Sequence, residues 1–107
     1  MDAQMKRGML EGCVLALLAR GDSYGYQLVK DMSALMDISE STLYPILRRL
    51  EAAGSLTVYT VEHNSRLRKY YAITDEGRKK IAAFLEEWKE IHKIYQFIAQ
   101  ENPAKEE

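Results

Sequence analysis

The residue pattern changes at Gly54, and this change restricts the fold more than any other feature of the chain. Residues 39–53 place their apolar side chains at the spacing of one helical face. Residues 55–62 and 68–73 instead show the period of two that is typical of strands, in which successive side chains point to opposite faces. Both segments are rich in β-branched and aromatic residues, and residues 63–67 form a polar connector between them. The chain is therefore predicted to pass from a helix directly into a two-stranded β-hairpin.

Helical spacing of apolar residues predicts further helices over residues 5–19, 24–36 and 75–100. Ser39 and Thr74 are the expected N-caps of the third and last helices, because hydroxyls accept bonds from the free N–H groups there. The side chains expected to face the core are Leu28, Met32 and Leu35 in the second helix, and Leu43, Ile46, Leu47 and Leu50 in the third. The fold is thus predicted to be mostly α.

Pro45 lies inside the third predicted helix, where a ring without an N–H weakens helical hydrogen bonding. With Ser39 or Ser41 as the cap, it falls near the end of the first turn or just past it, where little bonding is lost. Our hypothesis is that the ring stiffens this end of the helix and gives Thr42 and Tyr44 a fixed pose.

The last predicted helix carries an apolar seam with heptad spacing, formed by Ile81, Phe84, Trp88, Ile91, Tyr95 and Ile98. Three short helices and a hairpin are too small to cover this seam, so a partner is expected. Gly8 and Gly12 lie on one face of the first helix, where another helix could approach closely.

The charges are unevenly distributed, although the net charge of the chain is only −1. Residues 39–80 carry eight Lys or Arg and five Asp or Glu, which is a net charge of +3. Residues 81–107 carry three and six, which is a net charge of −3. The basic excess therefore lies in the segment of the third helix and the hairpin.

Composition and motifs exclude several classes. A chain of 107 residues with one cysteine is expected to form one domain without an internal disulfide and to be cytoplasmic. No apolar run approaches the roughly 18 residues of a membrane helix, and no metal-ligand spacing, phosphate loop or nucleophile motif occurs. Neither an enzyme nor a cofactor, metal or membrane partner is expected. Cys13, on the apolar face of the first helix, is expected to be a buried structural thiol rather than a redox sensor.

The predicted order of three helices, a hairpin and a closing helix is that of a winged helix-turn-helix, whose third helix enters the DNA major groove. The side chains left outside on the third helix are Ser41, Thr42, Tyr44, Arg48 and Arg49, and the hairpin tip carries Arg66, Arg68 and Lys69. Hydroxyls and arginines bond base edges and phosphates, so DNA is the expected partner.

Three segments resemble the PadR family of bacterial transcription regulators: LALLARGDSYGYQLVKDM, ISESTLYPILRRLEAAG and RKYYAITDEGRK. The resemblance covers about residues 5–95, and the single closing helix is similar to that of the short subfamily. It implies a homodimer that represses promoters, with the closing helix packed against the first helix of the other subunit. The dimer residues would be Met9, Ile81, Phe84, Trp88, Ile91, Tyr95 and Ile98.

The resemblance also implies the DNA-binding residues, which are Tyr24, Tyr26, Ser41, Thr42, Tyr44, Arg48, Arg68 and Lys69. The wing tip departs from the family pattern: it reads EHNSRL, where a Gly/Pro-rich turn is usual. The tip is therefore expected to bend differently, and a role for Arg66 does not carry over.

Trp88 falls at the position where some short-form members hold flat aromatic drugs between paired tryptophans. The resemblance thus implies a small aromatic or apolar effector that relieves repression, contacted by Met5, Met9, Trp88, His92 and Tyr95. Plain dimer packing of Trp88 is the alternative.

The expected organisation is a winged helix-turn-helix domain at 1–74, a dimerisation helix at 75–101 and a flexible tail at 102–107. A winged helix can also dock onto proteins without binding DNA. The polar outer face of the third helix favours DNA, because a docking face would be apolar.

Overall fold

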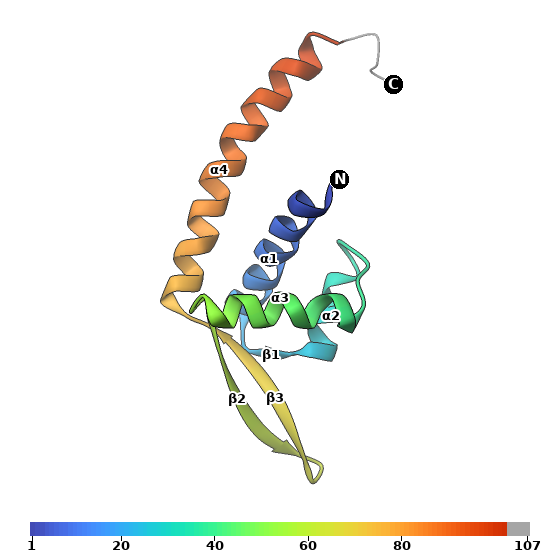
Figure 1. Cartoon of the computed structure of the whole chain (residues 1–107), viewed down its shortest axis with the longest axis vertical. Coiled ribbons are helices and arrows are strands. Elements are labelled where there is room, and N and C mark those ends of the chain that lie inside the picture. The colour runs from blue at the N-terminus through green and yellow to red at the C-terminus, as the bar shows by residue number, and fades with distance from the viewer. Residues whose placement is uncertain (103–107) are drawn as a thin grey trace.

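The computed structural model describes residues 1–102, so most of the predicted tail, residues 103–107, lies outside the described residues. The predicted order of three helices, a hairpin and a long closing helix is confirmed (Figure 1). The elements are α1 (Ala3–Arg20), β1 (Ser23–Tyr24), α2 (Gly25–Met32), α3 (Glu40–Ala52), β2 (Leu56–His63), β3 (Arg66–Ile73) and α4 (Asp75–Gln100).

The second helix is shorter than predicted at both ends. At its start the helix loses Tyr24, which belongs with Ser23 to β1 and pairs with β3. At the other end the chain leaves the helix at Ser33, whose hydroxyl donates to the carbonyl of Lys30 at 2.7 Å. The expectation that Leu35 faces the core is therefore wrong, since its side chain is 71% exposed. Leu28 and Met32 are buried as predicted.

The third helix begins and packs as its sequence predicts. Ser39 is the N-cap, and its side chain accepts a bond from the N–H of Thr42 at 3.3 Å. The helix continues through Pro45 without interruption to Ala52. Gly54 then takes a φ of +78°, which suits a residue without a Cβ, and the chain turns into β2. The buried residues are the predicted Leu43, Ile46, Leu47 and Leu50.

The hairpin is longer than predicted and belongs to a three-stranded antiparallel sheet in the order β1-β3-β2. Its two long strands pair from Leu56 opposite Ile73 to His63 opposite Arg66. The turn therefore contains only two residues, Asn64 and Ser65, both with positive φ. Positive φ at both positions is typical of the tight turns that match the twist of paired strands. The predicted five-residue connector was too long.

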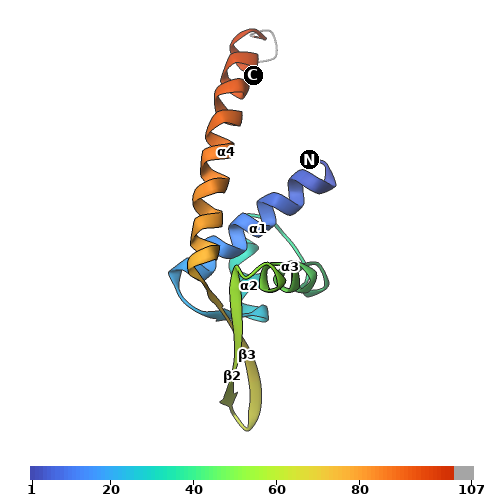
Figure 2. The same cartoon turned by 60° about the vertical axis from the view of Figure 1, so that its left-hand side comes forward.

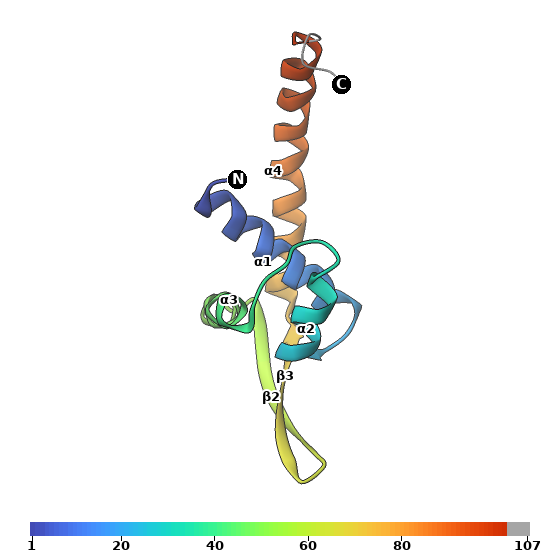
Figure 3. The ribbon, with the colours of Figure 1, turned by 90° about the vertical axis from the view of Figure 1, so that its right-hand side faces the viewer.

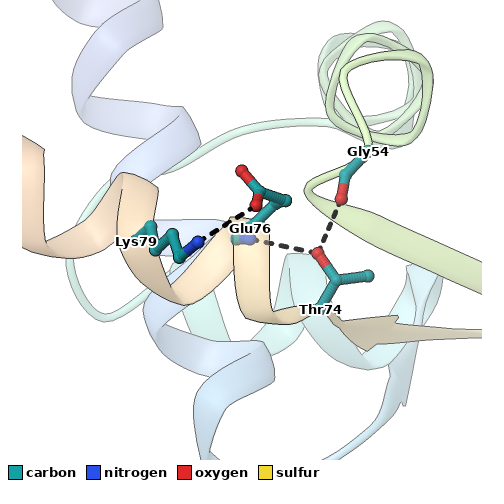
Figure 4. A network of polar contacts seen from close by, with 5 residues as sticks. Gly54, Thr74, Glu76 and Lys79 are labelled. Atoms are coloured by element: carbon teal, nitrogen blue, oxygen red, sulfur yellow. Dashed lines mark hydrogen bonds and ion pairs between the residues drawn. The ribbon is translucent and has the colours of Figure 1, made fainter.

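The hairpin of β2 and β3, called the wing below, joins α4 through a network of hydrogen bonds around Thr74, as Figure 4 shows. The hydroxyl of Thr74 accepts a bond from the N–H of Gly77 at 3.0 Å and donates to the carbonyl of Gly54 at 2.6 Å. The predicted cap of α4 is thus confirmed, and the same side chain ties the start of α4 to the end of α3.

The core lies where α1, α2, α3 and the base of the wing meet, and it is built mainly from leucines. α4 contributes Ile81 to its edge. Phe84 of α4 packs against Gly12 of α1, where an added Cβ would lie 3.0 Å from the ring. Gly12 therefore permits a close approach within this chain, whereas Gly8 has open space around it.

The chain is elongated, with extents of 60 × 27 × 22 Å. Figure 2 shows why: α4 and the wing project in opposite directions from the cluster of short helices, and the N-terminal half of α1 diverges from α4. The radius of gyration is 16.6 Å, against about 13 Å for a compact chain of this length. None of the helices within residues 1–102 is both long and apolar enough to cross a membrane.

Candidate nucleic-acid interface

A basic hollow of about 830 Å³ lies between the wing, the N-terminus of α2 and the N-terminus of α3. Figure 3 shows the wing descending between α2 and α3, which leaves both helices beside its base. The hollow is lined by Tyr24, Gly25, Tyr26, Glu40, Tyr44, His63, Asn64, Arg66, Leu67, Arg68, Lys69 and Tyr71. Its lining thus contains three cationic side chains, Arg66, Arg68 and Lys69, and one carboxylate, that of Glu40.

Arg68 and Lys69 point to opposite faces of the wing, because side chains alternate along a strand. Lys69 shares its face with Tyr71, whose ring is buried against the core, and its side chain is exposed. Arg68 shares its face with Tyr70, which is paired with Tyr24 of β1. Arg68 and Lys69, which were both expected to contact DNA, therefore project from different faces of the wing.

Arg68 is held by an aromatic ring rather than by a carboxylate. Its guanidinium carbon lies 4.1 Å from the centre of the Tyr24 ring. None of the ion pairs found within residues 1–102 includes Arg68. A cation held over a ring is positioned without being neutralised, so Arg68 keeps its full charge for an anion.

Three tyrosines form one row across the sheet on the face of Arg68. Tyr70 of β3 lies between Tyr24 of β1 and Tyr59 of β2 in the strand register. The rings of Tyr59 and Tyr70 are stacked at 5.6 Å, and those of Tyr70 and Tyr24 meet edge to face at 5.5 Å. At the end of the row, Tyr59 donates a 2.6 Å hydrogen bond to Asp22. This bond is the main reason why the pKa of Tyr59 is raised.

Of the four residues predicted to read DNA on α3, Ser41 and Arg48 lie at the centre of the outward face. Both side chains are exposed, and both project away from the buried leucine stripe, since a helix turns roughly 100° per residue. Ser41 belongs to a cluster of hydroxyls at the start of the helix, 2.8 Å from the hydroxyl of Ser39. Hydroxyls and a guanidinium are therefore presented together.

Thr42 and Tyr44 lie on opposite flanks of α3. Thr42 faces α1, where it lines a small hollow with Pro45 and Arg49. Tyr44 faces the wing, and its hydroxyl lies so close to Gly25 that a side chain there would collide with it. Partial burial, followed by the charge of nearby Glu40, raises the pKa of Tyr44. Tyr44 therefore forms the wall of the basic hollow as well as part of the helix surface.

Tyr26 is 64% exposed at the mouth of the same hollow. Of the eight residues predicted to contact DNA, the structure places Tyr24, Tyr26, Tyr44, Arg68 and Lys69 around the hollow. Ser41 and Arg48 lie on the adjoining face of α3, and Thr42 is turned toward α1.

Arg49 is engaged by another helix. Its Nε lies 3.3 Å from a carboxylate oxygen of Glu11 on α1, and the other oxygen of Glu11 lies 3.8 Å from Nζ of Lys80 on α4. Glu11 thus joins α1, α3 and α4. This contact was missed from the sequence, because Glu11 and Arg49 are 38 positions apart and no local pattern links them.

The residues predicted to bind an aromatic effector form two pairs on α4. Trp88 lies next to Phe84, with 5.9 Å between ring centres, and His92 stacks on Tyr95 at 6.1 Å. A crevice of about 300 Å³ lies between α1 and α4. None of the five predicted effector residues lines it: Met5, Met9, Trp88, His92 and Tyr95. Met5 is 44% exposed and Met9 is half-buried.

Among residues 1–102, no three His, Cys, Asp or Glu side chains gather as a metal site would require. Cys13 is half-buried on α1 rather than fully buried, and this burial raises the pKa of its thiol.

A third helix beside a basic β-wing defines the class of the protein, which is a winged helix-turn-helix. The sequence profile of the transcriptional regulator PadR-like family matches residues 14–83. The chain therefore belongs to the PadR-like family of transcriptional regulators, whose known members compared with it are regulators and not enzymes.

Solved structures and curated relatives agree with this assignment. A transcriptional regulator from Clostridium thermocellum has a TM-score of 0.80 and 36% identity, over 90% of this chain and 95% of that one. The negative transcriptional regulator PadR of Bacillus subtilis is 27% identical over 82 residues, which are 72% of this chain but only 45% of that protein. Its structure with operator DNA has a TM-score of 0.67 and 26% identity, over 72% of this chain and 46% of that one.

Proposed function

We propose that the chain is a homodimeric, sequence-specific DNA-binding regulator that represses transcription. The observation that carries the proposal is the hollow beside α3, which Arg66, Arg68 and Lys69 line. None of these three belongs to an ion pair found among residues 1–102. The relative from B. subtilis that was solved with operator DNA supports the same reading. In this proposal Ser41 and Arg48 contact base edges, and Lys69 contacts a phosphate.

DNA binding is tested by selecting sequences from a random duplex library and measuring affinities at several salt concentrations. Arg48→Ala is expected to relax preference at one base position per half-site, which corresponds to about 1–3 kcal/mol of discrimination. Lys69→Ala is expected to weaken all duplexes alike and to lower the salt slope by about 1. Lys93→Ala, on the exposed surface of α4, removes the same charge away from the hollow and is the control. Unchanged binding by both Arg48→Ala and Lys69→Ala would contradict the proposal.

Protein docking is the alternative, and heparin retention separates it from DNA binding. Phosphate contacts make heparin elution depend steeply on salt. Elution at low salt, together with no gel shift on the chain's own promoter DNA, would favour docking. The outer face of α3 carries exposed Ser41 and Arg48, which argues for DNA.

Dimerisation through α4 is the second part of the proposal. The far half of α4 exposes Ile91 (40%), Tyr95 (63%) and Ile98 (58%) of the predicted seam. This half of α4 lies away from the core, so these apolar side chains can be removed from water only if a partner covers them. A second copy of α4 and α1 would supply it.

Relief of repression by a small aromatic ligand is the third part. Phe84 packs against Gly12 of α1, and Trp88 follows it one turn later at the start of the far half of α4. A second copy packed on that half would bring another tryptophan close. Trp88 is the single tryptophan of the chain, so its fluorescence reports binding without interference. Planar aromatic compounds are expected to quench it and to reduce DNA affinity. No quenching across a broad panel would leave Trp88 as dimer packing.

A further inference from the structure

We propose that Tyr59, held by Asp22, is a positioning residue that fixes the guanidinium of Arg68 for a phosphate of bound DNA. The inference rests on the proposed DNA-binding function and deepens it. No sequence pattern singles out Tyr59, which lies on β2 outside the three segments that resemble the family.

The physical path from Tyr59 to Arg68 consists of contacts on one face of the sheet. Tyr59 stacks on Tyr70 with an interplanar angle of 13°, Tyr70 meets Tyr24 edge to face, and Tyr24 lies under the guanidinium of Arg68. Each ring comes from a different strand. A displacement of Tyr59 is therefore transmitted to the ring that supports Arg68.

The Asp22–Tyr59 bond fixes the end of this row that is farthest from the cation. Asp22 is exposed and lies just before β1, so its bond to Tyr59 ties β1 to β2 across β3. β1 has only two residues and would be weakly held by backbone pairing alone. Because Tyr24 is one of those two residues, the bond stabilises the strand that carries the support of Arg68.

Core packing does not explain Tyr59. Its side chain is 41% exposed on the outer face of the wing, opposite the buried face of Leu56 and Tyr71. An exposed tyrosine contributes little to a core, yet this one has two specific partners. A role in orienting a neighbour accounts for both of them.

This position suits phosphate binding. The guanidinium is held over the face of the Tyr24 ring, with its central carbon 4.1 Å from the ring centre. An arginine side chain held by a ring rather than by a carboxylate keeps its N–H groups for the oxygens of a phosphate. Arg49 shows the contrasting case, because its Nε is already bonded to the carboxylate of Glu11. Fixing the position of Arg68 in advance removes part of the entropy cost of binding.

The test is a double-mutant cycle between Tyr59 and Arg68, measured as affinity for one random-sequence duplex over a salt series. Arg68→Ala is expected to weaken binding about tenfold and Tyr59→Ala about three- to fivefold. In the Arg68→Ala background, Tyr59→Ala is expected to have almost no further effect. Thr57→Ala, an exposed change on the same strand and face, is the matched control and should bind like the unmodified protein.

Tyr59→Phe separates the hydrogen bond from the ring. It keeps the stack but loses the bond to Asp22, so its loss of affinity should fall between those of the unmodified protein and Tyr59→Ala. If Tyr59→Ala fails to fold in a thermal melt, Tyr59→Phe completes the same cycle.

Two results overturn the inference while leaving DNA binding intact: full affinity of a folded Tyr59→Ala, or effects of Tyr59 and Arg68 that multiply independently. Independent effects would mean that Tyr59 contacts DNA directly or acts through overall stability. Failure of the unmodified protein to bind any duplex would instead overturn the proposed function, and this inference with it.

Discussion

Three arginines of this protein have very different environments. Arg49 is bonded to Glu11, Arg68 lies over the ring of Tyr24, and Arg48 is exposed on the outer face of α3. Of the three, Arg68 and Arg48 take part in none of the ion pairs found among residues 1–102. Residue type alone predicted a basic surface, but the division of labour within it required the three-dimensional contacts.

Pro45→Ala tests the hypothesis that the proline ring stiffens the reading end of α3. Pro45 is the sixth residue of the helix and is half-buried in the hollow beside Leu10 of α1. Alanine restores an N–H, so the free energy of unfolding should rise by about 1–3 kcal/mol in urea titrations. Affinity for duplex DNA should fall in the same variant. If affinity holds or improves, the proline is only tolerated there.

Cys13 should react slowly with thiol reagents in the folded protein. Burial raises the pKa of its thiol, and the thiolate is the reactive form. Because the folded pKa is the higher one, this group contributes stability below its unfolded pKa and loses it as pH rises through the folded value. The rate of reaction with a chromogenic disulfide at about pH 8 should increase several-fold in urea. Equal rates in the folded and unfolded states would contradict this expectation.

At the scale of elements, the sequence predicted the helices and strands well where the signal was local. The caps at Ser39 and Thr74 and the buried stripe of α3 follow from spacing and hydroxyl chemistry, and they are confirmed. The short strand β1 was missed, because two residues carry no periodicity and their partners are distant in sequence: Ser23 pairs with Tyr71, 48 positions away (71 − 23). Leu35 was misplaced for a different reason: α2 ends at Met32, and the hydroxyl of Ser33 donates to the carbonyl of Lys30 at that end.

Part of the candidate site could be predicted in the same way. Ser41 and Arg48 follow from the buried stripe opposite them. The row of tyrosines depends on strand register, which the overlong connector concealed: once the turn is reduced to Asn64 and Ser65, Tyr59 falls opposite Tyr70. The bond to Asp22 had no local signal.

Thr74 is expected to stabilise the junction between the wing and α4 (Figure 4). Thr74→Val keeps the shape of the side chain but removes both the cap of Gly77 and the bond to the Gly54 carbonyl. Loss of a cap costs about 1 kcal/mol, with up to about 2 in some helices. Urea unfolding should show this loss, and Thr74→Ser, which keeps the hydroxyl, should recover most of it. An equal loss in both variants would mean that the methyl group matters more than the hydroxyl.

At the scale of the whole molecule, the feature that needs explanation is a long helix standing away from its own core. Its far half exposes apolar side chains along the predicted seam. The near half is different, because Ile81 and Phe84 pack within the chain. The predicted seam is therefore divided: its near part contacts the core of the same chain, and its far part is exposed.

Ile91→Lys tests that division by placing a charge in the far part of the seam. Sedimentation or light scattering should show a dimer for the unmodified protein and a monomer for the variant, because a buried charge without a partner is strongly disfavoured. Gln96→Lys adds the same charge away from the seam, on an exposed side of α4, and should remain dimeric. A dimer that survives Ile91→Lys would place the contact elsewhere.

The hydrogen bonds of Thr74 also connect Gly54, just past the end of α3, to one end of a long helix, α4. Its 26 residues extend for about 39 Å, at 1.5 Å per residue, and its first turn is bonded to the end of α3. If α4 tilted by about 5° at its start, its far end would move by roughly 3 Å over such a length. The bond from Thr74 to Gly54 therefore provides a direct contact through which a small rotation at the end of α3 would be amplified at the far end of α4.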